Sequence, residues 1–387
     1  MVKKRNIAVI GASGSVGGAV LDVCSRQSDV FRVWALAGNR NVEKILSLGR
    51  YFNTEFLALF DAAASERLKI ESEGRFSCHG GINGLLSLVD DPRCEEIVFA
   101  SSGTETLPVL VRALQTGKRV YLANKEIIVA AGEWIMPLAG DRIIPLDSEH
   151  NAVWQCLRGE KSNSVNNVYL TASGGPFLDT PAEELKTVSF KSARCHPVWP
   201  MGMKISIDSA TLMNKGIEMI EARHLFSLPN EKIHALIHPQ ALVHGFVEFI
   251  DGSVKMLFSR PDMRLAVLSA LGFPERIENR SLELAPPYLG GLSLEFREPD
   301  EKRFPCLSLA KEASRLGGPY PALLVGADEG AVELFMKNAI GFTEIPERIE
   351  EVLSSYDGGA PASWEESLSL VEFARRASLG SVIRRSD

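Results

Sequence analysis

A glycine-rich turn near the start of the chain constrains its fold more than any other feature. The apolar run at residues 6–10 ends at Gly11, and Gly14 and Gly17 follow at intervals of three, while a helical pattern begins near Ser15. A strand, a tight turn and a helix in this order open a βαβ unit. The sequence therefore predicts that the chain begins with a parallel, doubly wound α/β domain.

Further strand candidates alternate with helical or polar segments as far as residue 146. They are residues 31–37, 55–60, 96–100, 119–122 and 142–146. This alternation predicts a Rossmann-like domain over residues 1–147.

Beyond residue 147 the pattern changes, and we expect two more domains. A central α/β domain over 148–275 contains a helix near 212–226 and a hairpin signal at Asp251-Gly252. A linker rich in proline, glycine and charge follows at 276–303. Residues 304–387 show about four helical patterns separated by glycine-containing breaks, which predicts a small helical bundle domain.

Composition excludes several classes of protein. Hydrophobic residues make up 45% of the chain and charged residues 24%, and the formal net charge is −7. An acidic globular chain is not typical of nucleic-acid binding, and no apolar stretch approaches the roughly 20 residues that cross a bilayer. The first apolar run is too short for a secretion signal, and the six cysteines lack a Cys-x-x-Cys pair. We therefore expect a cytoplasmic protein without membrane or nucleic-acid partners.

The glycine turn also predicts a ligand. Its glycines let the backbone approach a pyrophosphate at the helix N-terminus. The spacing is G-x-x-G-x-x-G rather than G-x-G-x-x-G, so a turn that binds nothing is the alternative. The position at the start of a βαβ unit favours binding. The predicted cofactor contacts are Ser13, Gly14, Ser15 and Val16.

The end of the second strand candidate indicates which dinucleotide is bound. The segment Gly38, Asn39, Arg40 and Asn41 contains no carboxylate for a ribose 2′-hydroxyl. Arg40 offers a guanidinium that suits a 2′-phosphate, so we predict NADPH rather than NADH. The alternative for Arg40 is an ordinary solvated loop charge.

Two segments carry carboxylates that suit a metal ion. Asp147 and Glu149 follow a strand, and in an extended segment their side chains point the same way. A solvated turn is an equally good interpretation of this pair. In the helix near 212, Asn214, Lys215 and Glu218 share one face, although an exposed polar face with an ion pair is the commoner explanation.

Hydroxyl-bearing turns and a proline-rich segment complete the candidates. Ser173 and Ser209 lie in turns whose hydroxyls and backbone N–H groups suit an anion, although capping the next helix is the default role of Ser209. His196 and Trp199 lie in a segment broken by prolines and glycine, near 194–203. We expect a mobile lid there, and a tryptophan anchoring an ordinary loop is the alternative.

Taken together, these segments resemble the 1-deoxy-D-xylulose 5-phosphate reductoisomerase family, and the likeness extends over essentially the whole chain. Its most specific part runs from His196 to Glu218. The resemblance is carried by residues 11–17, 122–126, 146–149, 171–177, 196–218 and 237–240.

The resemblance implies a three-domain homodimer whose dimer interface lies in the central domain. It implies NADPH together with Mg²⁺ or Mn²⁺, with Co²⁺ as a further candidate, and a small sugar phosphate as substrate. The implied metal ligands are Asp147, Glu149 and Glu218. The implied catalytic residues are these three carboxylates together with Lys125 and His196. Asn124, Glu126 and Gly202 are implied to line the cofactor site. The implied substrate contacts are Lys125, Ser148, Glu149, Ser173, His196, Trp199, Ser209, Asn214, Lys215 and Glu218.

The family reaction rearranges 1-deoxy-D-xylulose 5-phosphate and then reduces it to 2-C-methyl-D-erythritol 4-phosphate. A metal ion suits the first half and a nicotinamide cofactor the second. Two alternatives remain at this point: a metal-independent NADPH-dependent semialdehyde dehydrogenase, and a non-catalytic dinucleotide-sensing protein. Loss of activity with a chelator would exclude the metal-independent dehydrogenase, and cofactor binding without turnover would identify the sensing protein.

Overall fold

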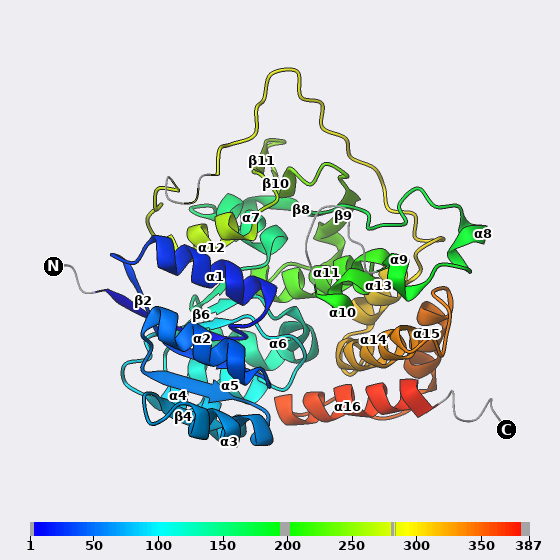
Figure 1. The fold of residues 1–387 in the computed structure, drawn as a ribbon. Coiled ribbons are helices and arrows are strands. Elements are labelled where there is room, and N and C mark those ends of the chain that lie inside the picture. The colour runs from blue at the N-terminus through cyan, green and yellow to red at the C-terminus, as the bar shows by residue number, and fades with distance from the viewer. Residues whose placement is uncertain (1–3, 194–201, 280–281, 283, 381–387) are drawn as a thin grey trace. The chain divides into compact units, whose positions relative to one another are not determined.

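The computed structural model describes residues 4–193, 202–279, 282 and 284–380 (Figure 1). The contacts within the chain divide it into two compact units. The first unit comprises residues 1–124, 137–151 and 262–286, and the second comprises 125–136, 152–261 and 287–387. The division into domains at residues 147, 275 and 303 stays a prediction.

A seven-stranded parallel sheet forms the centre of the first unit. Its strand order is β4-β3-β2-β1-β5-β6-β7, so the chain winds outward from β1 in both directions, as the sequence predicts. β4 was not among the predicted strands. The strands are β1 (Arg5–Ile10), β2 (Phe31–Gly38), β3 (Phe56–Leu59), β4 (Ser77–Gly80), β5 (Glu96–Phe99), β6 (Arg119–Leu122) and β7 (Ile143–Pro145).

Helices connect these strands, and one helix from much later in the chain joins them. The helices are α1 (Ser15–Arg26), α2 (Val42–Phe52), α3 (Ala62–Glu71), α4 (Gly81–Asp90), α5 (Leu107–Gln115) and α12 (Met263–Gly272). α12 packs against α1, where Figure 1 shows the two side by side. Arg264 of α12 pairs with Asp22 of α1 at 3.0 Å.

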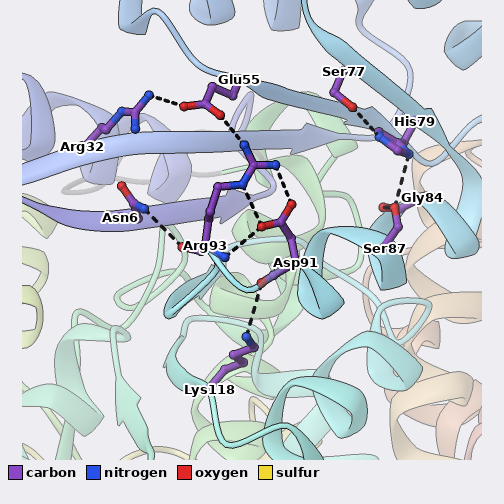
Figure 2. Close-up of polar contacts among 10 residues, drawn as sticks. All are labelled: Asn6, Arg32, Glu55, Ser77, His79, Gly84, Ser87, Asp91, Arg93 and Lys118. Atoms are coloured by element: carbon purple, nitrogen blue, oxygen red, sulfur yellow. Dashed lines mark hydrogen bonds and ion pairs between the residues drawn. The ribbon is translucent and has the colours of Figure 1, made fainter.

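Ion pairs close the edge of this sheet where its strands begin. Figure 2 shows Arg93 between Asp91 and Glu55, with Glu55 also paired to Arg32. The Arg93 guanidinium lies 5.1 Å from the ring centroid of Trp34, a fully buried side chain. These contacts cover the amino ends of the strands. Ligands in parallel α/β sheets bind at the opposite, carboxyl ends.

The second unit contains a four-stranded mixed sheet in the order β11-β10-β8-β9. The predicted hairpin at Asp251-Gly252 is confirmed, because β10 and β11 pair antiparallel around it. The sequence did not predict β8 and β9, which pair parallel. The strands are β8 (Val165–Ala172), β9 (Ile233–Ile237), β10 (Val243–Phe249) and β11 (Val254–Phe258).

Helices cover this sheet and form the C-terminal part of the second unit. α11 contacts β8 and β9, and α13 packs on α11. The four C-terminal helices confirm the predicted pattern, and Gly326 and Gly330 let α14 approach α16 closely. The helices are α8 (Ala182–Leu185), α9 (Phe190–Ala193), α10 (Met203–Ala210), α11 (Met213–Phe226), α13 (Cys306–Leu316), α14 (Tyr320–Met336), α15 (Glu344–Ser355) and α16 (Trp364–Gly380).

Two helices belong in part to each unit. α6 (Lys125–Ala139) is interrupted at Ala131, whose backbone is not helical, and α7 (Ser148–Leu157) begins in the first unit. Within the described part of the chain, no helix combines the length and apolar character that crossing a membrane requires.

Candidate active site

The glycine turn of the first unit is tightly packed against its neighbours. Gly11 has φ +86°, and a Cβ atom there would lie 2.4 Å from the backbone of Ala100 at the end of β5. A Cβ on Gly17 would lie 2.3 Å from the Gly11 carbonyl oxygen. Gly14 is the N-cap of α1 and supplies no side-chain cap. The first turn of α1 therefore presents backbone donors without a side chain over them, as a pyrophosphate site requires.

The loop after β2 lies at the same edge of the sheet. Gly11 and Ala12 both donate to the Ala37 carbonyl, at 2.9 and 3.0 Å, which places the glycine turn beside this loop. Arg40 is exposed. Asn41, predicted as a cofactor contact, caps α2 by accepting a hydrogen bond from the Lys44 N–H at 3.0 Å.

Asn124 holds the ends of two neighbouring strands together. It is 1% exposed, and its amide donates to the Gly103 carbonyl at 2.7 Å and to the Ser101 hydroxyl at 3.5 Å. The turn at residues 101–103 after β5 thus belongs to the same edge as the glycine turn. The sequence analysis did not select it. The signal that could have found this turn is the short Ser-Ser-Gly segment directly after a predicted strand.

Asp147 and Glu149 lie where β7 passes into α7. The predicted extended conformation of this segment was wrong: α7 begins at Ser148, and the Asp147 carbonyl accepts from the Asn151 N–H at 2.8 Å. The helix forms because Asn151 also donates to Pro145 O at 2.9 Å and fixes the turn. Both carboxylates therefore lie at a helix N-terminus, which favours negative charge.

Two neighbours orient these carboxylates. His150 is fully buried, with Nδ1 3.3 Å from Asp147 Oδ1, and the Ser148 hydroxyl donates to Glu149 Oε2. The sequence analysis did not select His150. The signal that could have found it is its spacing of three residues from Asp147, which a helix places on one face.

In the second unit, two lysines surround Glu218. The Lys125 ammonium lies 2.7 Å from Glu218 Oε1, and Lys215 donates to Glu218 Oε2. Asn214 bridges the pair, accepting from Lys125 at 3.0 Å and donating to Glu218 Oε1. Lys125, Lys215 and Glu218 are 7%, 3% and 1% exposed. Both lysines thus contact the same buried carboxylate, and their ammonium groups provide positive charge that suits an anionic ligand.

The turns at Ser173 and Ser209 pack together in the same unit. Gly174 and Gly175 have φ +91° and +71°, and a Cβ on Gly175 would lie 2.7 Å from the Ser209 carbonyl. The predicted capping role of Ser209 was wrong. Ser209 lies inside α10, and α11 starts after Leu212 at φ +60°, where the Thr211 hydroxyl accepts from the Met213 N–H at 3.3 Å.

The remaining predicted residues are placed as follows. Glu126 is buried at the start of α6, and Gly202 is the exposed N-cap of α10. His196 and Trp199 lie outside the described residues.

Comparison with known proteins identifies the family. Family models match three stretches: 1-deoxy-D-xylulose 5-phosphate reductoisomerase at residues 7–132, its C-terminal domain at 143–226, and the DXP reductoisomerase C-terminal domain at 258–377. The reductoisomerase of Prosthecochloris aestuarii is 40% identical over 96% of this chain and 98% of its own length. That of Pelotomaculum thermopropionicum is 42% identical, over 96% and 97%. This chain belongs to the 1-deoxy-D-xylulose 5-phosphate reductoisomerase family.

Solved structures of the family agree in fold. The reductoisomerase from Zymomonas mobilis in complex with NADPH shares 35% identity, with a TM-score of 0.90 over 98% of this chain and 99% of that chain. A DOX-P reductoisomerase in complex with NADPH, fosmidomycin and magnesium shares 34% identity, with a TM-score of 0.92 over 99% of both chains. The dehydrogenase and sensor alternatives are not favoured by these relatives.

Proposed function

We infer that this chain catalyses the NADPH-dependent conversion of 1-deoxy-D-xylulose 5-phosphate to 2-C-methyl-D-erythritol 4-phosphate. The observation that carries the inference is the buried group of Lys125, Lys215 and Glu218 in a full-length member of the family. The ammonium groups of Lys125 and Lys215 provide positive charge on either side of this carboxylate, and a sugar phosphate is a ligand of matching charge.

We assign the phosphate to the group formed by Ser173, Ser209, Asn214 and Lys215. The packing of Gly175 on the Ser209 carbonyl supports this assignment, because it places the turn after Ser173 against the helix that carries Ser209. Lys215 supplies the charge, and Asn214 and the hydroxyls supply directional hydrogen bonds. Ser148 and Lys125 then contact the hydroxyl region of the sugar. By resemblance, His196 and Trp199 cover it.

The carboxylates Asp147, Glu149 and Glu218 fit a hard divalent ion, Mg²⁺ or Mn²⁺. Each offers a carboxylate oxygen, which such ions prefer. A bound ion would supply a Lewis acid for the substrate carbonyl and for negative charge that develops on its oxygen. His150 Nδ1 lies 3.3 Å from Asp147 Oδ1, and the Ser148 hydroxyl donates to Glu149 Oε2. Lys125 orients the Glu218 carboxylate by donating to it.

The first unit fits NADPH. Gly11 and Gly17 have no Cβ atom, which lets the turn pack closely at the start of α1. The backbone N–H groups of the first turn of α1 are then the donors for the pyrophosphate. NADPH supplies the hydride for the reduction. Arg40 is exposed at the carboxyl end of β2 and is our assignment for the 2′-phosphate.

The test is NADPH oxidation with 1-deoxy-D-xylulose 5-phosphate, followed by absorbance, with Mg²⁺, with Mn²⁺ and with EDTA. We expect turnover with either metal ion and none with EDTA. Glu218→Gln should lose about a thousandfold in kcat while still binding NADPH, because an amide cannot balance the cation. Turnover that resists EDTA, or full activity in Glu218→Gln, would contradict the metal assignment. Absence of turnover with metal present would contradict the function.

We further propose that the chain forms a homodimer through the β11 edge. β11 is an outer strand of its sheet, and Ile250, Val254 and Met256 are 71%, 50% and 43% exposed. An apolar edge strand of this kind is normally covered in the folded protein. Light scattering should give a dimer for the wild type and a monomer for Val254→Lys/Met256→Lys. Ile70→Lys, at another exposed apolar residue, should remain a dimer.

We also propose a cytoplasmic location. The five described cysteines, Cys24, Cys78, Cys94, Cys156 and Cys306, are free thiols, which suits a reducing compartment. Cell fractionation is the check.

A further inference from the structure

A buried ion cluster joins α10 to α14 in the second unit, and none of its members belongs to the groups assigned above. The Lys204 ammonium on α10 lies 2.6 Å from Asp208 Oδ2, one turn along the same helix, and 2.6 Å from Asp328 Oδ2 on α14. The side chains of Asp208 and Asp328 are 3% and 0% exposed. Lys204 therefore bridges two carboxylates that solvent barely reaches.

This arrangement is costly for the fold. Burial raises the pKa of both Asp208 and Asp328, and repulsion by the nearby Glu126 raises both further, although Lys204 acts to lower them. The Oδ1 atoms of both aspartates are buried, and neither finds a hydrogen-bond partner among the described residues. Apolar side chains of similar size would usually give equal or greater stability. A role in fixing geometry explains the cluster better than a role in stability.

The geometry that the cluster fixes is that of the phosphate group. Asp208 immediately precedes Ser209, and its carbonyl accepts from the Thr211 hydroxyl at 3.2 Å. The same hydroxyl accepts from the N–H of Met213, where α11 begins. Asp208 is therefore bonded directly to the serine assigned to the phosphate. Through the Thr211 hydroxyl it is also linked to the start of the helix that carries Asn214 and Lys215.

We propose that Lys204, Asp208 and Asp328 are positioning residues for the substrate's phosphate, acting by fixing α10 to α14 so that Ser209 and the start of α11 keep their places. None of the three touches the substrate in this proposal. It rests on the proposed function, because it assumes that Ser209 and Lys215 bind a phosphate.

The test uses Asp328, which lies more than a hundred residues along the chain from Ser209. Asp328→Ala removes the acceptor on α14, whereas Asp328→Asn keeps an oxygen for Lys204 and removes one negative charge. We expect Asp328→Ala to raise KM for the sugar phosphate roughly tenfold or more, with kcat within about threefold and KM for NADPH unchanged. Asp328→Asn should retain a KM near that of the wild type.

Glu333→Ala is the matched control on α14. It removes a carboxylate that pairs with Lys337 and Arg375 at 2.7 and 2.6 Å, outside the cluster, and should leave KM unchanged. Lys204→Met is a second variant that breaks the cluster from the other side, and we expect the same selective rise in KM.

The possible results distinguish a wrong positioning role from a wrong proposed function. A wild type that does not turn over the sugar phosphate overturns both. If the wild type is active and Asp328→Ala and Lys204→Met fold with wild-type KM, only the positioning role is wrong. Equal losses for the sugar phosphate and NADPH, or failure of both variants to fold, would show a general structural role and overturn it too. If one variant does not fold, the KM of the other decides.

Discussion

At the level of single residues, the balance of charge explains more than the identity of any one group. Glu218 alone would be a costly buried carboxylate, and Lys125 and Lys215 both pair with it. Removing one partner of a buried ion pair usually costs about 3–5 kcal/mol because the other charge remains unpaired. The two lysines therefore serve both the folded state and the anionic substrate, and neither role can be removed without disturbing the other.

Arg40 offers a test at this level that does not disturb folding, because its side chain is exposed. A charged hydrogen bond to the 2′-phosphate is worth ~1.5–3 kcal/mol, so Arg40→Ala should reduce the preference for NADPH over NADH by about ten- to a hundredfold. The measurement is kcat/KM with each cofactor.

Arg50→Ala is the control for Arg40, because Arg50 is also exposed and lies in the last turn of α2, after the same loop. It should keep the preference of the wild type. A full preference for NADPH in Arg40→Ala would assign the 2′-phosphate to another group.

At the level of elements, the sequence predicts best where the local pattern and the fold agree. The parallel sheet, the β10–β11 hairpin and the four C-terminal helices follow from apolar periodicity and from glycine-containing breaks. β4 was missed because Ser77–Gly80 contains no run of apolar residues. Its place in the sheet comes from pairing with β3.

The α10 helix was missed for a different reason. Its serines and aspartate favour turns and caps locally, so the segment indicates a turn. The contacts of Lys204 with Asp208 and Asp328 lie within the folded unit, and no local pattern shows them. The candidate site could not be chosen from local patterns either. A solvated turn explained Asp147 and Glu149 equally well, an exposed polar face was the commoner explanation of Asn214 and Glu218, and the resemblance over the whole chain selected them.

The packing of α6 on α11 gives a prediction at the level of elements. A Cβ on Gly132 of α6 would lie 2.5 Å from the His224 ring of α11. Gly132→Ala should therefore lower the free energy of unfolding by about 1–3 kcal/mol through overpacking, although alanine favours a helix. Urea unfolding measures the change.

Gly18→Ala is the matched control, because Gly18 lies within α1 and a Cβ there meets nothing within 4 Å. This substitution should raise the free energy of unfolding by about 0.5–1 kcal/mol. Equal effects of the two substitutions would mean that helix propensity, and not contact with His224, decides at Gly132.

At the level of the whole molecule, buried histidines set how stability depends on pH. Burial lowers the pKa of His224 to about 4 and that of His244 to about 4. In the unfolded chain a histidine titrates near ~6.5, so between these values the unfolded state binds more protons. The stability that the neutral histidines contribute is complete above pH 6.5 and is lost as the pH falls toward 4. The raised pKa values of Asp208 and Asp328 act in the opposite direction.

A comparison of variants isolates the histidine contribution from that of the aspartates. His244 is 6% exposed, and this burial disfavours its protonated form in the folded protein. One such group lowers the free energy of unfolding by about 2 kcal/mol at pH 5 relative to pH 8. His244→Gln cannot take up this proton, and its deficit relative to the wild type at pH 8 should shrink by about that amount, or reverse, at pH 5. Urea unfolding of both proteins at the two pH values measures the difference. A deficit that stays the same at pH 5 and pH 8 would mean that His244 titrates alike in the folded and unfolded chain, and that the loss of stability in acid arises elsewhere.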